Sequence, residues 1–519
     1  MKWKTLEHNG VLFPPEHQHR GLSTKMRGIE INLNSQQEEM AWAWAKKINT
    51  PYVDDEVFQK NFLADFVKLL PSELAELRID EIDFSEIVKC QEKERDVSPD
   101  LKKKLAVERK QRREILKEQF GFAELDGTRT EVASYLVEPP GIFMGRGAHP
   151  MRGKWKPRVY PENVILNLGE DAHIPPVPIS GRKWGKVIHD HDSTWLARWS
   201  DGLSNEMKYI WLADISPIRQ ERDKAKYDKA KKLNKSIEKV KKRILKGMRS
   251  RDVRERKVAT VAYLIESLAM RVGDEKDEDE ADTVGATTLR VEHMQITDSK
   301  VEFDFIGKDS VRCQSTLQVD SDRTIIENLT EFSKDKKPTD TIFDNISSDA
   351  VNRFLSKGMK GLTAKVFRTF HASNEVREYL REKVSDHDSI DKKVYHARMA
   401  NLQAAKRCNH KRTRPKNWEE RLAKKKEKLG DVKKKEAKTE KGKLRLDQRI
   451  EKWKLKIDLD ENTMDYNLNT SLRNYIDPRI FKEWSGPINL DLAKIYPKTL
   501  QRKFAWVNST KSKQSHGPE

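Results

Sequence analysis

The sequence predicts an α+β protein that is predominantly helical, and three observations support this class. Apolar residues recur at helical spacing in 35–96 and 218–272, and 99–119 is a strongly charged stretch opened by Ser-Pro. Residues 128–215 are instead rich in Pro and Gly and contain alternating runs such as STWLARWSD, which are typical of short strands between long ordered loops. The string VEFDFIGKDSVRCQSTLQV at 301–319 predicts a β-hairpin with its turn at IGKDS.

The remaining elements follow from local patterns. Residues 1–20 mix aromatics, His and two prolines, so we expect short strands and loop there. The string KVATVAYLIESLAMRVG carries apolar residues at helical spacing, which predicts a helix ending near Gly273. After the β-hairpin, helices are expected to about residue 411.

Residues 416–456 differ from their surroundings, with 17 Lys and Arg against 8 Asp and Glu. Their sparse apolar residues recur at helix-seam spacings: Trp418, Leu422, Leu429, Val432, Leu446, Ile450, Trp453 and, just beyond, Ile457. We interpret the segment as an antiparallel helical hairpin that projects into solvent. The alternatives are one solvated charged helix or a disordered linker.

The composition is that of a basic, hydrophilic chain with enough aromatic residues to fold. The 519 residues include 102 Lys and Arg against 83 Asp and Glu, a net charge of +19. Such a charge favours a polyanionic partner, nucleic acid before an anionic membrane. No run of 18 apolar residues occurs, so we expect no membrane span.

Cysteine and histidine spacing argues against a metal site. The three cysteines are far apart and form no CxxC motif, which excludes a disulfide framework and a multi-cysteine zinc site. The pairs His17/His19 and His189/His191 have no further ligands nearby in sequence, and we interpret them as surface histidines.

Five residues suited to phosphate chemistry lie in distinctive strings of the second half: Arg271, Lys308, Arg368, His410 and Tyr475. Taken singly, each has an ordinary structural explanation. The two arginines could form salt bridges, for which 274–282 supplies acidic partners. The lysine could be plain surface, the histidine solvated and the tyrosine part of a core.

Together the strings resemble the type IB enzymes of the eukaryotic DNA topoisomerase I family. The resemblance covers almost the whole chain. It rests on KWKTLEHNG, EPPGIFMGRGAHP, ADTVGATTLRVEH, VEFDFIGKDSVR, GLTAKVFRTFHAS, CNHKR and NYIDPR. The long charged N-terminal extension typical of the family is missing here, and the linker is comparatively short.

The resemblance implies a two-lobed clamp around duplex DNA. Its expected parts are a β-rich DNA-binding core subdomain (1–14 and 102–215), a helical cap (15–101), a mainly helical catalytic core of the tyrosine-recombinase/topoisomerase IB type (216–413), a basic helical-hairpin linker (414–465) and a small C-terminal domain (466–519). We expect a monomer that relaxes supercoils of either sign. The nucleus is the expected location, with a viral or organellar form as the alternative because the extension is missing.

The resemblance also assigns roles to the five residues. Tyr475 would attack a DNA phosphodiester and form a 3′-phosphotyrosine. Arg271, Arg368 and His410 would hold the non-bridging oxygens, where charge accumulates in the transition state. Lys308 would protonate the departing 5′-oxygen as general acid. The covalent bond conserves the phosphoester, so neither ATP nor another cofactor is implied, and the cationic cluster takes the place of a metal.

Further matches suggest DNA contacts. Arg146, between two glycines and close to His149, would approach the cleavage site through the minor groove. With Asp309 and Asn474 it would line the pocket for camptothecin-type poisons. The expected phosphate contacts of the β-rich region are Lys154, Lys156, Arg158, Lys183 and Lys186, some of which could be solvated surface residues instead.

Two other functions stay open on the residues alone. A tyrosine recombinase uses a related Arg/Lys/Arg/His/Tyr set, but would need a synaptic tetramer and a sequence-specific site. A basic chromatin or RNA-binding protein would explain the charge, but gives no reason for the tyrosine of NYIDPR and predicts no covalent adduct with DNA.

Overall fold

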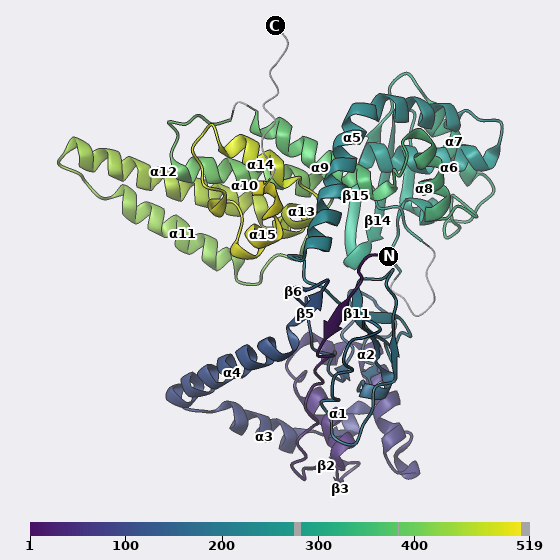
Figure 1. Cartoon of the computed structure of the whole chain (residues 1–519), viewed down its shortest axis with the longest axis vertical. Coiled ribbons are helices and arrows are strands. Elements are labelled where there is room, and N and C mark those ends of the chain that lie inside the picture. The colour runs from purple at the N-terminus through teal and green to yellow at the C-terminus, as the bar shows by residue number, and fades with distance from the viewer. Residues whose placement is uncertain (275–281, 382, 510–519) are drawn as a thin grey trace. The chain divides into compact units, whose positions relative to one another are not determined.

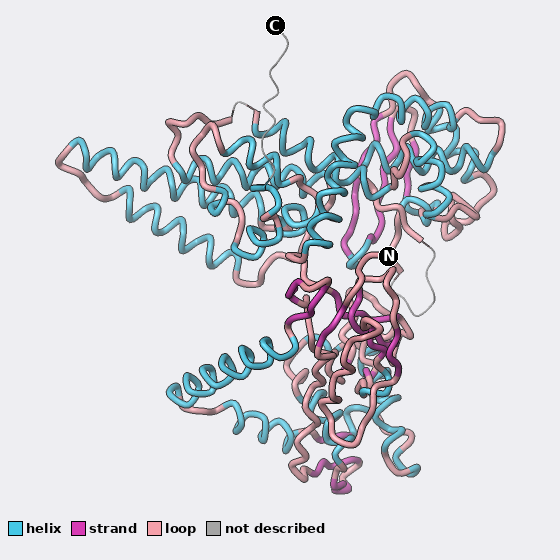
Figure 2. Tube along the Cα trace, in the orientation of Figure 1, coloured by secondary structure: helices cyan, strands magenta, loops and turns pink. Residues whose placement is uncertain are grey.

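The computed structural model describes residues 1–274, 282–381 and 383–509, and these residues confirm the predicted α+β class with helices predominating. Strands form short sheets among helices and loops (Figures 1 and 2). The described chain divides into two compact units, which meet in sequence between Arg219 and Gln220. We call them unit 1, which has residues 1–219 and also Asp282, and unit 2, which has the other described residues from 220 on. The finer division into five parts stays a prediction.

The β-rich part of unit 1 contains two main sheets and one short β-ribbon. One sheet is antiparallel and consists of β1 (Leu6–His8), β5 (Phe122–Leu125) and β6 (Thr128–Glu131). The other has the order β10-β9-β11-β12 and consists of β9 (Ile165–Asn167), β10 (Lys186–Ile188), β11 (Trp195–Ser200) and β12 (Met207–Trp211). The ribbon pairs β7 (Gly141–Ile142) with β8 (Trp155–Lys156). Because β1 pairs with β5, the first residues of the chain fold with residues more than one hundred positions later.

The rest of unit 1 is mainly helical, as its periodicity predicted. Its helices are α1 (Ser35–Ala45), α2 (Glu56–Phe66), α3 (Ser85–Arg95) and α4 (Pro99–Phe120), with a small sheet of β2 (Ser23–Met26), β3 (Ile29–Asn32) and β4 (Ile82–Asp83). Trp44, Phe58, Phe62 and Phe66 pack as an aromatic core beneath α1 and α2. The charged helix opened by Ser-Pro is confirmed as α4, in which only Phe120 is buried.

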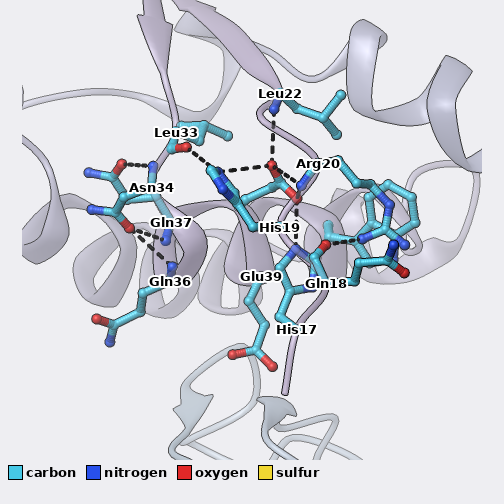
Figure 3. Close-up of polar contacts among 12 residues, drawn as sticks. His17, Gln18, His19, Arg20, Leu22, Leu33, Asn34, Gln36, Gln37 and Glu39 are labelled. Atoms are coloured by element: carbon cyan, nitrogen blue, oxygen red, sulfur yellow. Dashed lines mark hydrogen bonds and ion pairs between the residues drawn. The ribbon is translucent and has the colours of Figure 1, made fainter. Parts of the chain in front are cut away.

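The interpretation of His17 as a surface histidine is wrong. Its Nε2 lies 2.8 Å from an oxygen of the fully buried Glu38 on α1, and His19 Nε2 lies 3.5 Å from the other oxygen (Figure 3). The backbone N–H groups of Arg20 and Leu22 also donate to this carboxylate. Burial would raise the pKa of Glu38, but these donors lower it below its ordinary value. The two histidines therefore help to fasten residues 17–22 to α1.

Unit 2 surrounds the predicted hairpin with helices. Its first helices are α5 (Pro217–Met248, in unit 2 from Gln220) and α6 (Val253–Leu268). The hairpin is confirmed as β14 (Lys300–Gly307) and β15 (Val311–Gln318), with β13 (Met294–Ile296) added at its edge. The helices that follow are α7 (Thr324–Ser333), α8 (Ser348–Gly358), α9 (Ala364–Leu380) and α10 (Ile390–Arg407).

The prediction for the end of α6 is wrong by five residues. The helix ends at Leu268, because Ala269 adopts a left-handed conformation with φ 52°. The residues that follow are not helical, so Arg271 does not lie within the predicted helix.

The basic segment forms the predicted helical hairpin. Helices α11 (Trp418–Lys433) and α12 (Glu440–Thr463) run side by side and are drawn yellow-green in Figure 1. Lys426 Nζ on α11 lies 2.7 Å from Glu461 Oε1 on α12. Lys411 pairs with Tyr466 at the base of the hairpin, where the chain leaves and returns.

The last described helices pack on α9 and α10. They are α13 (Leu468–Asn474), α14 (Pro478–Ser485), α15 (Lys498–Lys503) and α16 (Trp506–Ser509). The expected C-terminal domain extends to residue 519, and 510–519 lie outside the described residues. Across the described part of the chain, no helix combines the length and the apolar character needed to cross a bilayer.

Candidate active site

Tyr475 lies at the C-terminal end of α13, and two other predicted residues contact its ring. The guanidinium carbon of Arg368 lies 5.1 Å from the ring centroid. The ring of His410 lies 5.0 Å from it, tilted by 36°. The side chain is only half-buried, so the phenol is accessible to a ligand while two basic side chains flank it.

Arg368 is held by backbone carbonyls. It projects from α9 and is 5% exposed. Its Nη1 donates to the carbonyl oxygen of Ala269 at 2.6 Å, and its Nη2 donates to that of Cys408 at 2.8 Å. Among the described residues, no carboxylate pairs with it. Most of the acidic segment expected to supply such a partner, 275–281, lies outside the described residues.

His410 is placed by the way α10 ends. Asn409 takes a left-handed conformation with φ 49°, and the His410 N–H donates back to the carbonyl of Ala405 at 2.9 Å. This is the hydrogen bonding of a Schellman cap, for which Asn is suited because it tolerates positive φ. The cap turns the chain abruptly and leaves the imidazole buried beside Arg368.

The environment of His410 favours its neutral form. Burial, and then the charges of Arg368 and Arg271, lower its pKa to about 3. Its Nε2 lies 3.2 Å from Arg368 Nη2, and a guanidinium can only donate, so Nε2 accepts and Nδ1 carries the proton. An anion that entered between these groups would raise the pKa of His410, because it would stabilise the imidazolium.

A close crossing of two backbone segments fixes the chain at Arg271. The N–H of Ala286 donates to the Arg271 carbonyl at 2.9 Å. Gly273 has φ +84°, and a Cβ on Gly285 would lie 2.4 Å from the Gly273 Cα. Both positions therefore need glycine, and together they hold the non-helical stretch after α6 in one conformation.

Arg271 belongs electrostatically to the same cluster. Burial, and then the like charge of Arg368, lower its pKa, while Tyr475 and Asp309 act in the opposite direction. Its guanidinium makes no hydrogen bond or ion pair with any other residue that the structure describes. The structure thus brings together four of the five predicted residues, with their charges uncompensated by carboxylates in contact.

Lys308 lies on the turn of the β14–β15 hairpin, next to Asp309, whose charge acts on Arg271. Its side chain is exposed, and its amino group has no hydrogen-bond or ionic partner within the described ranges. The next two residues, Asp309 and Ser310, both have left-handed φ values, 66° and 56°. Such conformations are uncommon outside glycine and mark a strongly constrained turn. An exposed lysine on a rigid arm can reach a bound ligand without disturbing the cluster.

A side-chain contact ties this hairpin to the cap that places His410. Asn409 Nδ2 donates to the carbonyl oxygen of Arg312, four residues after Lys308. Of the two other residues expected near the site, Asp309 is exposed on the turn and Asn474 is the exposed last residue of α13.

The cations expected to contact DNA in unit 1 fall into two groups. Lys154 pairs with Asp65 at 3.5 Å, Lys156 pairs with Asp201 at 2.7 Å and with Glu138, and Arg158 Nη2 donates to Glu39 at 2.8 Å. Burial would lower the pKa of Lys156, but its two carboxylates raise it. By contrast, Lys183 and Lys186 are exposed and have no ionic partner in the described structure.

The Gly-Arg-Gly turn of unit 1 presents Arg146 to solvent. Gly145 and Gly147 have φ values of 60° and 59°, so the turn requires glycine on both sides. The ring of His149 packs edge-on against Phe143 at 4.8 Å, and its Nδ1 accepts from the N–H of Met151.

Sequence reasoning missed two side chains that shape the site. Asn409 had a usable signal, since Asn directly after Lys-Arg-Cys at a helix end is typical of a left-handed cap. Ser373, whose hydroxyl contacts the backbone on both sides of Ile476, had none, because both hydrogen bonds span more than one hundred residues.

Three family models match the chain. The model of the eukaryotic DNA topoisomerase I DNA-binding fragment matches residues 1–212, that of the catalytic core of the same enzymes matches 215–443, and that of the C-terminal topoisomerase domain matches 447–515.

Curated relatives match over nearly the whole chain. DNA topoisomerase 1 beta of Arabidopsis thaliana is 37% identical, and the match covers 98% of this chain and 58% of that protein. DNA topoisomerase 1 of Homo sapiens is 34% identical, over 98% and 71%, and that of Caenorhabditis elegans is 37% identical, over 98% and 67%. The chain therefore spans between 58% and 71% of the length of these relatives. With three family models and such relatives in agreement, the chain belongs to the eukaryotic DNA topoisomerase I family.

Proposed function

We propose that this protein is a type IB DNA topoisomerase, which relaxes positive and negative supercoils by cutting one strand, allowing rotation and resealing the cut without ATP. The observation that carries the proposal is the contact of the Tyr475 ring with Arg368 and His410, neither of which has a carboxylate partner in the described structure. A nucleophile flanked by unneutralised cations is the arrangement that an anionic phosphodiester requires.

In the proposed cleavage step, the Tyr475 oxygen attacks the phosphorus atom and the bond to the 5′-oxygen breaks. The products are a 3′-phosphotyrosine and a free 5′-hydroxyl, so the number of phosphoester bonds is unchanged. Resealing is the reverse reaction, in which the 5′-hydroxyl attacks and the phenol leaves. Because no bond energy is lost, neither direction needs an external energy source.

The cluster would stabilise the charge that develops on the non-bridging oxygens. Arg271 and Arg368 offer planar, permanently charged donors that suit phosphate geometry. The Arg368 side chain is already fixed by two carbonyls and the Arg271 backbone by its bond from Ala286, so little reorganisation of these elements is needed. His410 would donate one further hydrogen bond from its buried imidazole.

Lys308 would serve as the general acid. Its exposed position on the hairpin turn leaves its amino group available to a leaving oxygen. In this role it protonates the 5′-oxygen during cleavage and takes the proton back during resealing.

We propose double-stranded DNA as the partner, held mainly through phosphates by a single copy of the chain in the nucleus. Among the five cations of the β-rich region expected to contact phosphates, Lys183 and Lys186 suit such contacts best, because they are exposed and unpaired in the described structure. We also propose that Arg146, Asp309 and Asn474 line a site for camptothecin-type compounds when DNA is bound.

The test is relaxation of a supercoiled plasmid without a cognate site, in EDTA and without ATP. Relaxation under these conditions distinguishes the proposed enzyme from a sequence-specific recombinase and from a non-enzymatic DNA-binding protein. Tyr475→Phe removes only the hydroxyl, so it should abolish relaxation while DNA affinity stays within a few-fold. A covalent protein–DNA complex trapped with the Phe variant would disprove the assignment of the nucleophile.

A further inference from the structure

Ser373 connects the helix that carries Arg368 to the backbone that carries Tyr475. It lies on α9 and is 5% exposed. Its Oγ donates to the Tyr475 carbonyl oxygen at 3.3 Å and accepts from the Asp477 N–H at 3.1 Å. One hydroxyl thus contacts the backbone on both sides of Ile476.

Besides the packing of the fully buried Ile476, the contacted segment has few other hydrogen bonds within the described residues. Tyr475 already lies outside the helical conformation, with φ −124°, and α14 begins only at Pro478. The N–H groups of Tyr475 and Ile476 both donate to the Ser471 carbonyl, which closes the end of α13. The next two backbone groups, the Tyr475 carbonyl and the Asp477 N–H, are those that Ser373 satisfies.

Neighbouring contacts hold the flanking helices rather than the tyrosine itself. Ser471 Oγ donates to Asn401 Oδ1 at 2.8 Å, which anchors α13 to α10. Asp477 caps α14 and is bound by Arg479, whose Nη1 also donates to Asp228 on α5 at 2.7 Å. Between these two anchors, the Ser373 hydroxyl is the side-chain contact that acts on the Tyr475 backbone.

The position of Ser373 on α9 gives this contact a consequence for the chemistry. Arg368 and Ser373 lie five residues apart on one helix, which corresponds to about 7.5 Å along its axis. A helix of this length behaves as a rigid element. It therefore holds the Arg368 guanidinium and, through Ser373, the Tyr475 backbone at a fixed distance from each other. If the Tyr475 backbone could move relative to Arg368, the angle at which the phenol oxygen approaches a bound phosphate would change.

We propose that Ser373 is a positioning residue for Tyr475, which sets the line of attack of the phenol oxygen relative to the phosphate held by Arg368. The proposal rests on the proposed function. It predicts a defect in the approach of the nucleophile, and it leaves the protonation of the leaving group and the binding of DNA unchanged.

The experiment compares single-turnover DNA cleavage by the full-length parent, Ser373→Ala and the control Ser485→Ala. Ser485 is a similarly buried serine, 4% exposed, on α14, and its hydroxyl donates only to the Lys482 carbonyl of the same helix. We expect Ser373→Ala to slow cleavage and resealing by about 10- to 100-fold, because a displacement of about 1 Å can cost about 100-fold. DNA affinity and thermal unfolding should match those of Ser485→Ala.

Cleavage of a substrate with sulfur in place of the 5′-bridging oxygen is measured as well. This measurement separates a defect in the approach of the nucleophile from a defect in protonation of the leaving group, and a general loss of stability would not change the comparison. This leaving group needs no proton, so it should restore Lys308→Ala but leave Ser373→Ala slow. Ser373→Thr keeps the hydroxyl and should cleave within a few-fold of the parent. If Ser373→Ala does not fold, Ser373→Cys replaces it, since a thiol keeps the volume and hydrogen-bonds only weakly.

Three results would overturn the proposal: cleavage by the Ala or Cys variant at the parental rate, equal slowing by Ser485→Ala, or rescue of the Ser373 variant by the sulfur substrate. Failure of the parent itself to cleave DNA would instead disprove the proposed function, and the parent is measured first for that reason.

Discussion

The basic residues near Tyr475 and the basic residues of unit 1 differ in what neutralises them. Arg368 is almost fully buried, yet its partners are two carbonyl oxygens and a histidine. Arg158 and Lys156 are also largely buried, but each is bound by at least one carboxylate. The family resemblance implied that the first group acts in catalysis and that the second group binds DNA phosphates, and the structure shows that their partners differ in kind.

The presence or absence of a carboxylate partner therefore distinguishes a buried cation that stabilises the fold from one that is available to an anionic ligand. A buried charge without an opposite charge is costly, and it is tolerated where an anionic ligand completes the arrangement. A buried cation in contact with a carboxylate is already neutralised, and a phosphate would have to compete with that carboxylate for it. The following predictions test this distinction, from the largest expected effect to the smallest.

Lys308→Ala should slow DNA cleavage by about 10²–10⁴, the usual range for loss of a general acid. Lys308 is unpaired in the described structure and exposed, so its removal should leave the fold intact. Single-turnover cleavage of a normal substrate and of a 5′-bridging sulfur substrate gives the measurement. Without rescue by sulfur, Lys308 would have a phosphate-binding or structural role instead.

Arg368→Ala should slow cleavage by about 10²–10³, as expected for the loss of one preorganised donor to a developing oxyanion. Arg368→Lys should recover little of this rate, because an ammonium cannot bind the carbonyls of Ala269 and Cys408 and also present a planar fork. Both are measured as single-turnover rates at saturating enzyme. Full activity of the Lys variant would show that charge alone is required.

Arg158→Ala should lower the free energy of unfolding by about 1.5–3 kcal/mol, the range for hydrogen bonds to a charged group. Arg158 donates to Glu39 on α1 and to the carbonyls of Pro14 and Pro15, so it connects three segments of unit 1. Denaturant unfolding measures the loss. The cleavage rate per folded molecule should not change, and a large fall in that rate at unchanged stability would contradict the distinction drawn above.

Replacing both Lys183 and Lys186 with Ala should reduce the salt dependence of DNA binding. The slope of log affinity against log salt should fall in magnitude by roughly 0.9 for each DNA phosphate that the variant no longer neutralises. Lys156→Ala is the matched control, since Asp201 and Glu138 already bind its amino group. If Lys156→Ala changed the slope as much as the double variant, a lysine's carboxylate partners in the free protein would not predict whether that lysine contacts DNA.

Local patterns predicted those parts of the fold that depend on near neighbours in sequence. The β14–β15 hairpin and the α11–α12 hairpin followed from periodicity, and the start of α4 followed from Ser98 and Pro99. The end of α6 did not follow. Ala269 and Met270 favour a helix locally, and it is the packing of the next residues against Gly285 that ends it.

The sequence predicted which residues form the candidate site. It did not predict how their side chains are held or which groups they contact. The strings around Arg271, Lys308, Arg368, His410 and Tyr475 named the chemical groups. That Arg368 is held by carbonyls rather than carboxylates depends on contacts across about one hundred residues, which no local pattern encodes. Likewise, partners for Lys156 and Arg158 come from distant segments, so sequence could not tell them from Lys183 and Lys186.

Backbone hydrogen bonds join the two chain segments at the base of the α11–α12 hairpin, so the tip of the hairpin can vary in length. The Asn467 N–H donates to the His410 carbonyl at 2.7 Å, and the Arg412 N–H donates to the Asp465 carbonyl at 2.8 Å. The chain therefore returns to where it left. The C-terminal half of α12 also packs on α10, where Tyr395 donates to Asp458 and Lys452 lies 3.0 Å from Asp391. Only the turn between α11 and α12, at 434–439, is therefore a loop whose lengthening would cost little, about 0.6 kcal/mol of closure entropy for each doubling of its length. Insertions can thus accumulate at this turn without changing the geometry of the nucleophile, which leaves the tip of the hairpin open to independent adaptation.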